Sequence, residues 1–244
     1  MKIVLLMLLV AVAGLAGCGG SDQDSQPAVS ATRAADADTE ARVISGRLEE
    51  GLRVLTFDPA QPDAHFTIYR GDYVRPELVG GGPFTIEIPD LDVAMSVPVP
   101  EGERPYFKVP DPGVYRFHIG ELTGEIEALE YADSRYREVT AQEARRFIAD
   151  RRPVVLDVRT PREYASGHLE NAVLIPIQNL AQRLGELDAH KSDPVFIYCR
   201  TGNRSTVAAQ MLIKAGFGEV VNLRRGIVEW AREGLPIVKE AHGP

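Results

Sequence analysis

The chain has 244 residues, a length that fits one or two domains. Hydrophobic residues make up 44% of it and charged residues 25%, which are ordinary values for globular protein. The formal net charge of -8 argues against nucleic acid as a partner.

The first residues have the pattern of an export signal. Lys2 supplies a minimal positive charge, and the apolar run over residues 3–12 is too short to span a bilayer as a mature helix, so residues 1–17 are predicted to be a signal peptide. Leu15-Ala16-Gly17-Cys18 resembles the lipobox of bacterial lipoproteins. That resemblance implies cleavage before Cys18 and lipid modification of its thiol, which would anchor the mature chain in a membrane. An ordinary secreted protein is the alternative.

The resemblance also implies a location. A lipoprotein of this kind sits on the periplasmic face of the cell envelope, and an aspartate after the modified cysteine favours the inner membrane in such families. Gly19 stands there in this chain, so we expect the outer membrane. Residues 18–42 are rich in Ser, Asp, Ala and Gln and contain no aromatic residue, so they are predicted to form a flexible tether.

Residues 43–132 are predicted to be all-β. Short apolar or alternating runs, separated by Gly, Pro and Asp, predict strands at residues 53–57, 65–69, 84–88, 106–109, 114–119 and 124–129. Strands of this length with regular turn signals favour a β-sandwich. The run over residues 112–117, with residues 71–74 before it and 124–126 after it, loosely resembles a cupredoxin-like sandwich.

Copper is not expected in this sandwich. A blue-copper site needs two histidines, a cysteine and usually a methionine. After Cys18 this region has no cysteine and offers only His65, His118 and Met95, without the ligand spacing of that family. We therefore expect neither a metal nor a cofactor, and we expect residues 43–131 to serve as a scaffold or as a docking surface for a protein partner.

After a short charged connector over residues 133–138, strands alternate with helices. Strands are predicted at residues 153–158, 172–175, 195–198 and 220–223, and helices at residues 141–148, 180–187, 205–214 and 226–233. Thr140 with Glu143, and Thr160 with Glu163, form capping boxes that predict two helix starts. This alternation favours a parallel α/β sheet covered on both faces, with functional sites at the carboxyl ends of its strands.

Cys199 stands at such a strand end. The loop after it contains Arg200 and Arg204, and a helix with a hydroxyl residue, Ser205, at its start follows. Positive charge and inward backbone N–H groups at a helix start stabilise a thiolate, which is the nucleophilic form of cysteine. A buried structural cysteine is the alternative. The chain has two cysteines, so if Cys18 carries lipid, Cys199 has no partner for a disulfide within the chain.

Four motifs together resemble a single rhodanese domain over residues 136–244. They are residues 156–164, residues 167–172, the loop Cys199-Arg200-Thr201-Gly202-Asn203-Arg204-Ser205, and residues 226–230. The resemblance implies a parallel five-stranded sheet with helices on both faces. It also implies that Cys199 takes sulfur from a donor such as thiosulfate, becomes a persulfide, and passes the sulfur to a cyanide or thiol acceptor, while residues 200–205 bind the substrate.

The length of the loop distinguishes sulfur transfer from phosphate hydrolysis, which related domains catalyse. The loop from Cys199 to Arg204 is one residue shorter than in related phosphatases and arsenate reductases, so we expect sulfur transfer rather than phosphate hydrolysis. Asp157, Arg159 and Glu163 are expected to support the site by capping helices or by pairing with arginines that brace the loop. The alternative function is a binding module. Such a module would carry a persulfide without turnover or would only dock to a partner.

Overall fold

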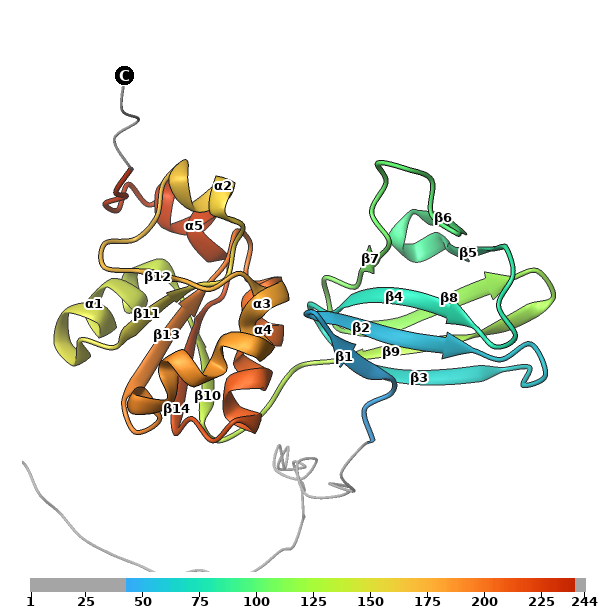
Figure 1. Cartoon of the computed structure of the whole chain (residues 1–244), viewed down its shortest axis with the longest axis horizontal. Coiled ribbons are helices and arrows are strands. Elements are labelled where there is room, and N and C mark those ends of the chain that lie inside the picture. Colours follow the sequence, from blue (N-terminus) through green and yellow to red (C-terminus); the bar gives the residue numbers. More distant parts are fainter. Residues whose placement is uncertain (1–42, 240–244) are drawn as a thin grey trace, which may run out of the picture. The chain divides into compact units, whose positions relative to one another are not determined.

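The computed structural model describes residues 43–239. Their first part, the N-terminal β region, comprises β1 to β9 (Figure 1). Its strands are β1 (Arg47–Glu49), β2 (Leu52–Phe57), β3 (Ala64–Tyr69), β4 (Tyr73–Leu78), β5 (Phe84–Ile88), β6 (Val93–Val97), β7 (Phe107–Lys108), β8 (Gly113–Ile119) and β9 (Leu122–Leu129), with a short 3-10 turn, η1 (Pro89–Leu91), before β6.

Two sheets make up the N-terminal β region. One has the order β1-β2-β4-β7 and the other β3-β9-β8-β5-β6. Buried side chains of both sheets, among them Phe57 and Val74 from the first and Ile68 and Phe117 from the second, meet in one apolar core. The predicted all-β organisation is therefore present, while the likeness to cupredoxins stays a prediction.

The second part, the C-terminal α/β region, comprises β10 to α5. Its strands are β10 (Tyr136–Val139), β11 (Val154–Asp157), β12 (Val173–Leu174), β13 (Pro194–Tyr198) and β14 (Glu219–Leu223). Its helices are α1 (Ala141–Arg151), α2 (Pro161–Ala165), α3 (Ile177–Arg183), the 3-10 helix η2 (Leu184–His190), α4 (Asn203–Lys214) and α5 (Gly226–Arg232).

The strands of the C-terminal α/β region form one five-stranded sheet with the order β10-β14-β13-β11-β12, and every pairing is parallel. Side chains of β13 alternate between its faces: Val195 and Ile197 pack with α3 and α4, while Phe196 and Tyr198 pack with α1 and α5. Figure 1 shows α3 and α4 on one side of the sheet and α1 on the other. The prediction of a parallel sheet with helices on both faces is confirmed, and β13 is its central strand.

Several sequence expectations differ from the structure. Strands β1 and β6 were not predicted, and the helix predicted at residues 180–187 begins earlier, as α3, and continues as η2. Residues 133–138 were expected to be a connector, but they contain most of the edge strand β10, whose charged Glu138 is neutralised by Arg70 from the N-terminal β region. No strand was predicted at β4, which contains Pro76. The proline is tolerated because β7 pairs only with the first two residues of β4, so that the backbone of Pro76 lies beyond this pairing. Helix α4 begins at Asn203 rather than at Ser205.

Candidate active site

Cys199 directly follows the central strand, and α4 begins at Asn203, so a short loop connects the sheet to the helix N-terminus. The backbone N–H of Gly202 donates to the Cys199 sulfur at 3.2 Å. The Ser205 hydroxyl lies 3.5 Å from the same sulfur and 2.8 Å from the Gly202 carbonyl. Because a hydroxyl has one hydrogen to donate, it donates to the closer carbonyl. The main donor to the sulfur is thus a backbone amide at the start of a helix, where an anion is favoured.

Gly202 is required by the shape of this loop. Its φ is +98°, and a Cβ at this position would lie 1.9 Å from the carbonyl oxygen of Arg224. Its own carbonyl accepts from Ser205 and, at 3.0 Å, from the Thr206 hydroxyl. Gly202, which presents its N–H to the sulfur, is therefore held by the hydroxyls that bind its carbonyl and by the close approach of Arg224.

The Cys199 side chain is fully buried. Burial is what the alternative of a structural cysteine predicted, and it means that the sulfur is not open to solvent in this conformation. The N-terminal end of α5 also holds the backbone of the loop, because Ile227 N–H donates to the Cys199 carbonyl at 2.9 Å and Val228 N–H to the Arg200 carbonyl at 3.2 Å.

Arg204 and Glu163 form a two-point ion pair beside the loop, with nitrogen–oxygen distances of 2.8 and 2.7 Å. Glu163 also completes the predicted capping box with Thr160 at the start of α2. Burial alone would raise the pKa of Glu163, but the hydrogen bonds from Arg204 and Thr160 outweigh it and hold that pKa at about 2. Glu163 is therefore ionised at neutral pH and pairs with an arginine in the first turn of α4.

Asp157 and Arg159 lie apart from the sulfur. Arg159 donates to both carboxylate oxygens of Asp157, to Oδ2 at 2.6 Å and to Oδ1 at 2.9 Å, and donates to the Gly167 carbonyl at 2.8 Å. Its guanidinium carbon lies 5.5 Å from the centre of the Tyr198 ring. This buried pair therefore fixes the chain that leaves β11 and contacts the strand before Cys199, without reaching the loop.

The other predicted loop residues divide between a cavity and the outer surface. Arg200 and Arg204 line a cavity of about 530 Å³. Thr201 is exposed and Asn203 half-buried, and within residues 43–239 neither side chain makes a hydrogen bond or lines this cavity. Only the two arginines of the predicted set thus face a space that could hold a substrate.

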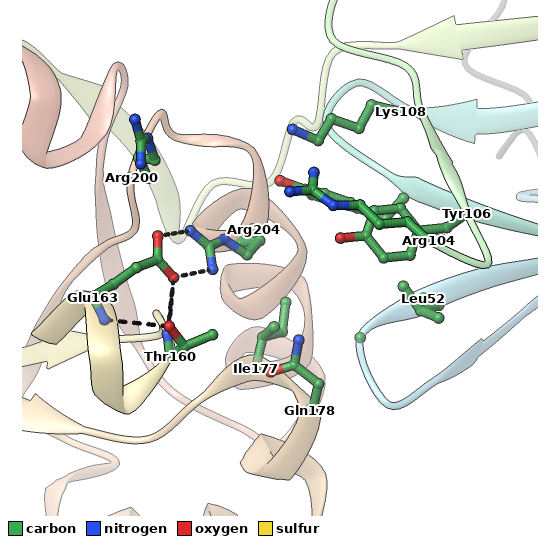
Figure 2. Close-up of a pocket in the computed structure, with 12 residues that line it drawn as sticks. Leu52, Arg104, Tyr106, Lys108, Thr160, Glu163, Ile177, Gln178, Arg200 and Arg204 are labelled. Carbon is green, nitrogen blue, oxygen red and sulfur yellow. Dashed lines mark hydrogen bonds and ion pairs between the residues drawn. The ribbon is translucent and has the colours of Figure 1, made fainter. Parts of the chain in front are cut away.

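The cavity has a wall that the sequence analysis missed. Figure 2 shows Arg104, Tyr106 and Lys108 reaching from the N-terminal β region toward the side of the cavity that carries Arg200 and Arg204. These three residues occupy alternate positions of one segment, and all three line the cavity. That alternation was visible in the sequence, but nothing in the sequence indicated which element it would face.

Comparison with known proteins identifies the C-terminal α/β region. A sequence profile described as the rhodanese-like domain matches residues 140–233. Over 102 residues the chain is 42% identical to a protein of Allochromatium vinosum named sulfurtransferase, a match that covers 41% of this chain and 94% of that protein. The chain belongs to the rhodanese family. Its rhodanese domain is the C-terminal α/β region, and the predicted resemblance is confirmed there.

Other relatives match the same part of the chain. YibN of Escherichia coli K12 is 36% identical over 107 residues, which cover 43% of this chain and 75% of YibN. A crystal structure of a rhodanese-related protein from Thermoplasma volcanium is 33% identical, covers 43% of this chain and 100% of that chain, and gives a TM-score of 0.39.

A chain of hydrogen bonds links the N-terminal β region to the rhodanese loop. Arg70, which is 8% exposed, donates to Glu138 of β10 at 2.7 Å. The Asn222 amide donates to Glu138 at 3.2 Å and lies 3.2 Å from the Thr206 hydroxyl, which holds the Gly202 carbonyl. The position of Gly202 therefore depends on contacts that begin outside the rhodanese domain.

Within residues 43–239, no three His, Cys, Asp or Glu side chains come together in a way that could hold a metal ion. In the same part of the chain, no helix combines the length and apolar character that crossing a bilayer requires. The predicted lipidation site, Cys18, lies outside the described residues.

Proposed function

We propose that this protein is a lipid-anchored sulfurtransferase on the periplasmic side of the cell envelope, with the outer membrane favoured, and that Cys199 carries the transferred sulfur as a persulfide. One observation carries the catalytic part of the proposal: the Cys199 sulfur accepts the Gly202 N–H at the helix start, 3.2 Å away. The rhodanese profile and the relative named sulfurtransferase support the class of reaction.

With thiosulfate as donor, the Cys199 thiolate attacks the outer sulfur. A new S–S bond forms, the S–S bond of thiosulfate breaks, and sulfite leaves with the electron pair. A thiol or cyanide then attacks the outer sulfur of the persulfide and releases the Cys199 thiolate. Each step conserves charge and involves no net oxidation. The Gly202 N–H and the nearby arginine charge stabilise the anionic sulfur that each step forms or consumes.

The location rests on the sequence. The export signal and lipobox support cleavage before Cys18 and attachment of lipid to it. Residues 18–42 would then separate the membrane from the domains, and residues 43–131 would be available to a protein partner.

The test supplies thiosulfate and cyanide to the full chain and measures thiocyanate. We expect Cys199→Ser to abolish the product, because serine cannot form a persulfide. Cys18→Ala is the matched control, since it removes the other cysteine of the chain and should leave the rate of the wild type. Equal rates for Cys199→Ser and the wild type would remove the catalytic assignment.

The complete burial of Cys199 favours a second candidate, a module that holds sulfur delivered by a partner or that binds without chemistry. Intact mass after treatment with donor separates these cases. A gain of one sulfur atom with negligible thiocyanate production would indicate a carrier. An unchanged mass would indicate a module that only binds.

A further inference from the structure

The cavity beside Arg200 and Arg204 is larger and more varied than an inorganic sulfur donor requires. Its volume of about 530 Å³ lies in the range of pockets that hold organic ligands of drug size. Leu52 and Ile177 give it apolar surface, and Tyr73 and Tyr106 give it aromatic surface. A small, fully charged anion such as thiosulfate would leave most of this lining unused.

The wall in the N-terminal β region is fixed by the pairing of β4 with β7. Tyr73 is paired with Lys108, and Val74 with Phe107. Val74 and Phe107 enter the apolar core of the β region, so the alternation of strand side chains turns Tyr73 and Lys108 the other way, into the cavity. The Lys108 ammonium lies 5.3 Å from the centre of the Tyr73 ring.

Among the described residues, four cationic side chains line the cavity, but only one carboxylate does. The cations are Arg104, Lys108, Arg200 and Arg204. Of the lining residues, Glu163 is the acidic one, and it is occupied by its two-point pair with Arg204. In the part of the chain that the structure describes, no carboxylate forms an ion pair with Arg104, Lys108 or Arg200. Burial lowers the pKa of Lys108, and the charges of Arg104, Arg204 and Arg200 lower it further. A ligand with negative charge would relieve this repulsion.

We propose that Arg104 and Lys108 bind the carboxylates of an organic thiol or persulfide whose sulfur reacts at Cys199, and that the N-terminal β region thereby determines the specificity of the rhodanese domain. Figure 2 shows both side chains extending into the cavity opposite Arg200 and Arg204. The aromatic and apolar lining would pack against the organic part of such a molecule, while the arginines of the loop face its reacting end.

The reaction part of this inference rests on the proposed function. With a donor R–S–SH, the Cys199 thiolate attacks the outer sulfur, the S–S bond of the donor breaks, and R–S⁻ leaves with the electron pair. Cys199 becomes Cys199–S–SH, so the hydrogen stays on the transferred sulfur and no oxidant is needed. The binding part does not depend on turnover and can be tested separately.

Calorimetric titration of the full chain with glutathione sulfonate tests the binding part. This unreactive probe carries carboxylates on an organic frame of suitable size. We expect the double variant Arg104→Gln with Lys108→Gln to bind it about tenfold more weakly than the wild type, as befits the loss of two partly exposed charges. Arg116→Gln, which removes an exposed charge of β8, is the matched control and should not change binding. Equal affinities of the wild type and the double variant, or no binding by the wild type, would overturn the proposal.

Kinetics test the link to sulfur transfer. Glutathione persulfide and the persulfide of glutathione diethyl ester differ in their carboxylates. We expect the wild type to prefer the first donor in kcat/KM, and we expect this preference to fall about tenfold in the double variant but not in Arg116→Gln. An unchanged preference contradicts the assignment of Arg104 and Lys108. If neither donor loads sulfur onto Cys199, the proposed function fails, and the calorimetric titration still decides whether the cavity binds organic anions.

Discussion

The ion pair between Glu163 and Arg204 permits a quantitative prediction. Glu163→Gln removes the negative charge but keeps a side-chain oxygen that can accept the Thr160 N–H, so the helix cap is largely preserved. The drop in the pKa of Glu163 from an ordinary 4.5 to about 2 corresponds to roughly 3.4 kcal/mol. Because solvent screens this partly exposed pair, we expect the substitution to reduce the free energy of unfolding by about 1–2 kcal/mol at pH 7.

The loss should depend on pH in a defined direction. The pKa of Glu163 is lower in the folded chain than in the unfolded chain, so its contribution to stability is complete above about pH 4.5 and disappears as the pH falls toward 2. Glutamine does not titrate. The difference in stability between the wild type and Glu163→Gln should therefore be constant from pH 7 to about 5 and shrink at pH 4 and again at pH 3.

Urea unfolding followed by tryptophan fluorescence provides the assay. Trp230 is the single tryptophan of the chain and is buried in α5, so its emission reports on the rhodanese domain alone. Glu143→Gln is the control, because Glu143 caps α1 through Thr140 in the same way but has no hydrogen bond to an arginine within residues 43–239. If both variants lose equal stability at pH 7, or if the loss in Glu163→Gln is as large at pH 3 as at pH 7, the pairing with Arg204 is not its source.

Three further predictions concern the loop and the anchor. Gly202→Ala should destabilise the rhodanese domain by about 2 kcal/mol or more and prevent sulfur loading, as judged by urea unfolding and intact mass. Gly216→Ala has a similar backbone conformation but open space around it, so it should fold and load normally. Arg70→Met should raise the rate of Cys199 alkylation by iodoacetamide several-fold, and an unchanged rate would exclude the coupling argued above. Cys18→Ala should move the protein from the membrane fraction to the soluble fraction, and continued sedimentation with membranes would refute the lipid anchor.

Features set by short stretches of sequence were predicted well. Both capping boxes, Thr140 with Glu143 and Thr160 with Glu163, are present, because each depends on residues three positions apart in a single helix turn. The strand β13 was predicted from its unbroken apolar run, and the structure covers it on both faces, as such a run requires.

Features that depend on distant partners were not predictable in the same way. Tyr136 to Val139 contains two charged residues, and it forms a strand because its backbone pairs with β14, far along the chain. The charge of Glu138 is met by Arg70, which lies 68 positions earlier. Likewise, nothing near Arg104 or Lys108 in the sequence indicates that these side chains face Arg200 and Arg204. The start of α4 was misplaced because Ser205 was read as a helix start, whereas its hydroxyl bonds back to Gly202 from within the first turn.

The burial of Cys199 connects these observations. No donor can reach a sulfur without solvent exposure, so transfer requires a conformation in which the sulfur is open, and each 1.4 kcal/mol needed to reach it costs about a factor of ten in apparent rate. The hydrogen bonds that fix Gly202 run through Asn222 and Glu138 to Arg70 in the N-terminal β region. The same region supplies the cationic wall of the cavity. A substrate that binds this wall would therefore contact the same region that restrains the loop through Arg70, so recognition of the substrate and access to the sulfur both depend on the N-terminal β region.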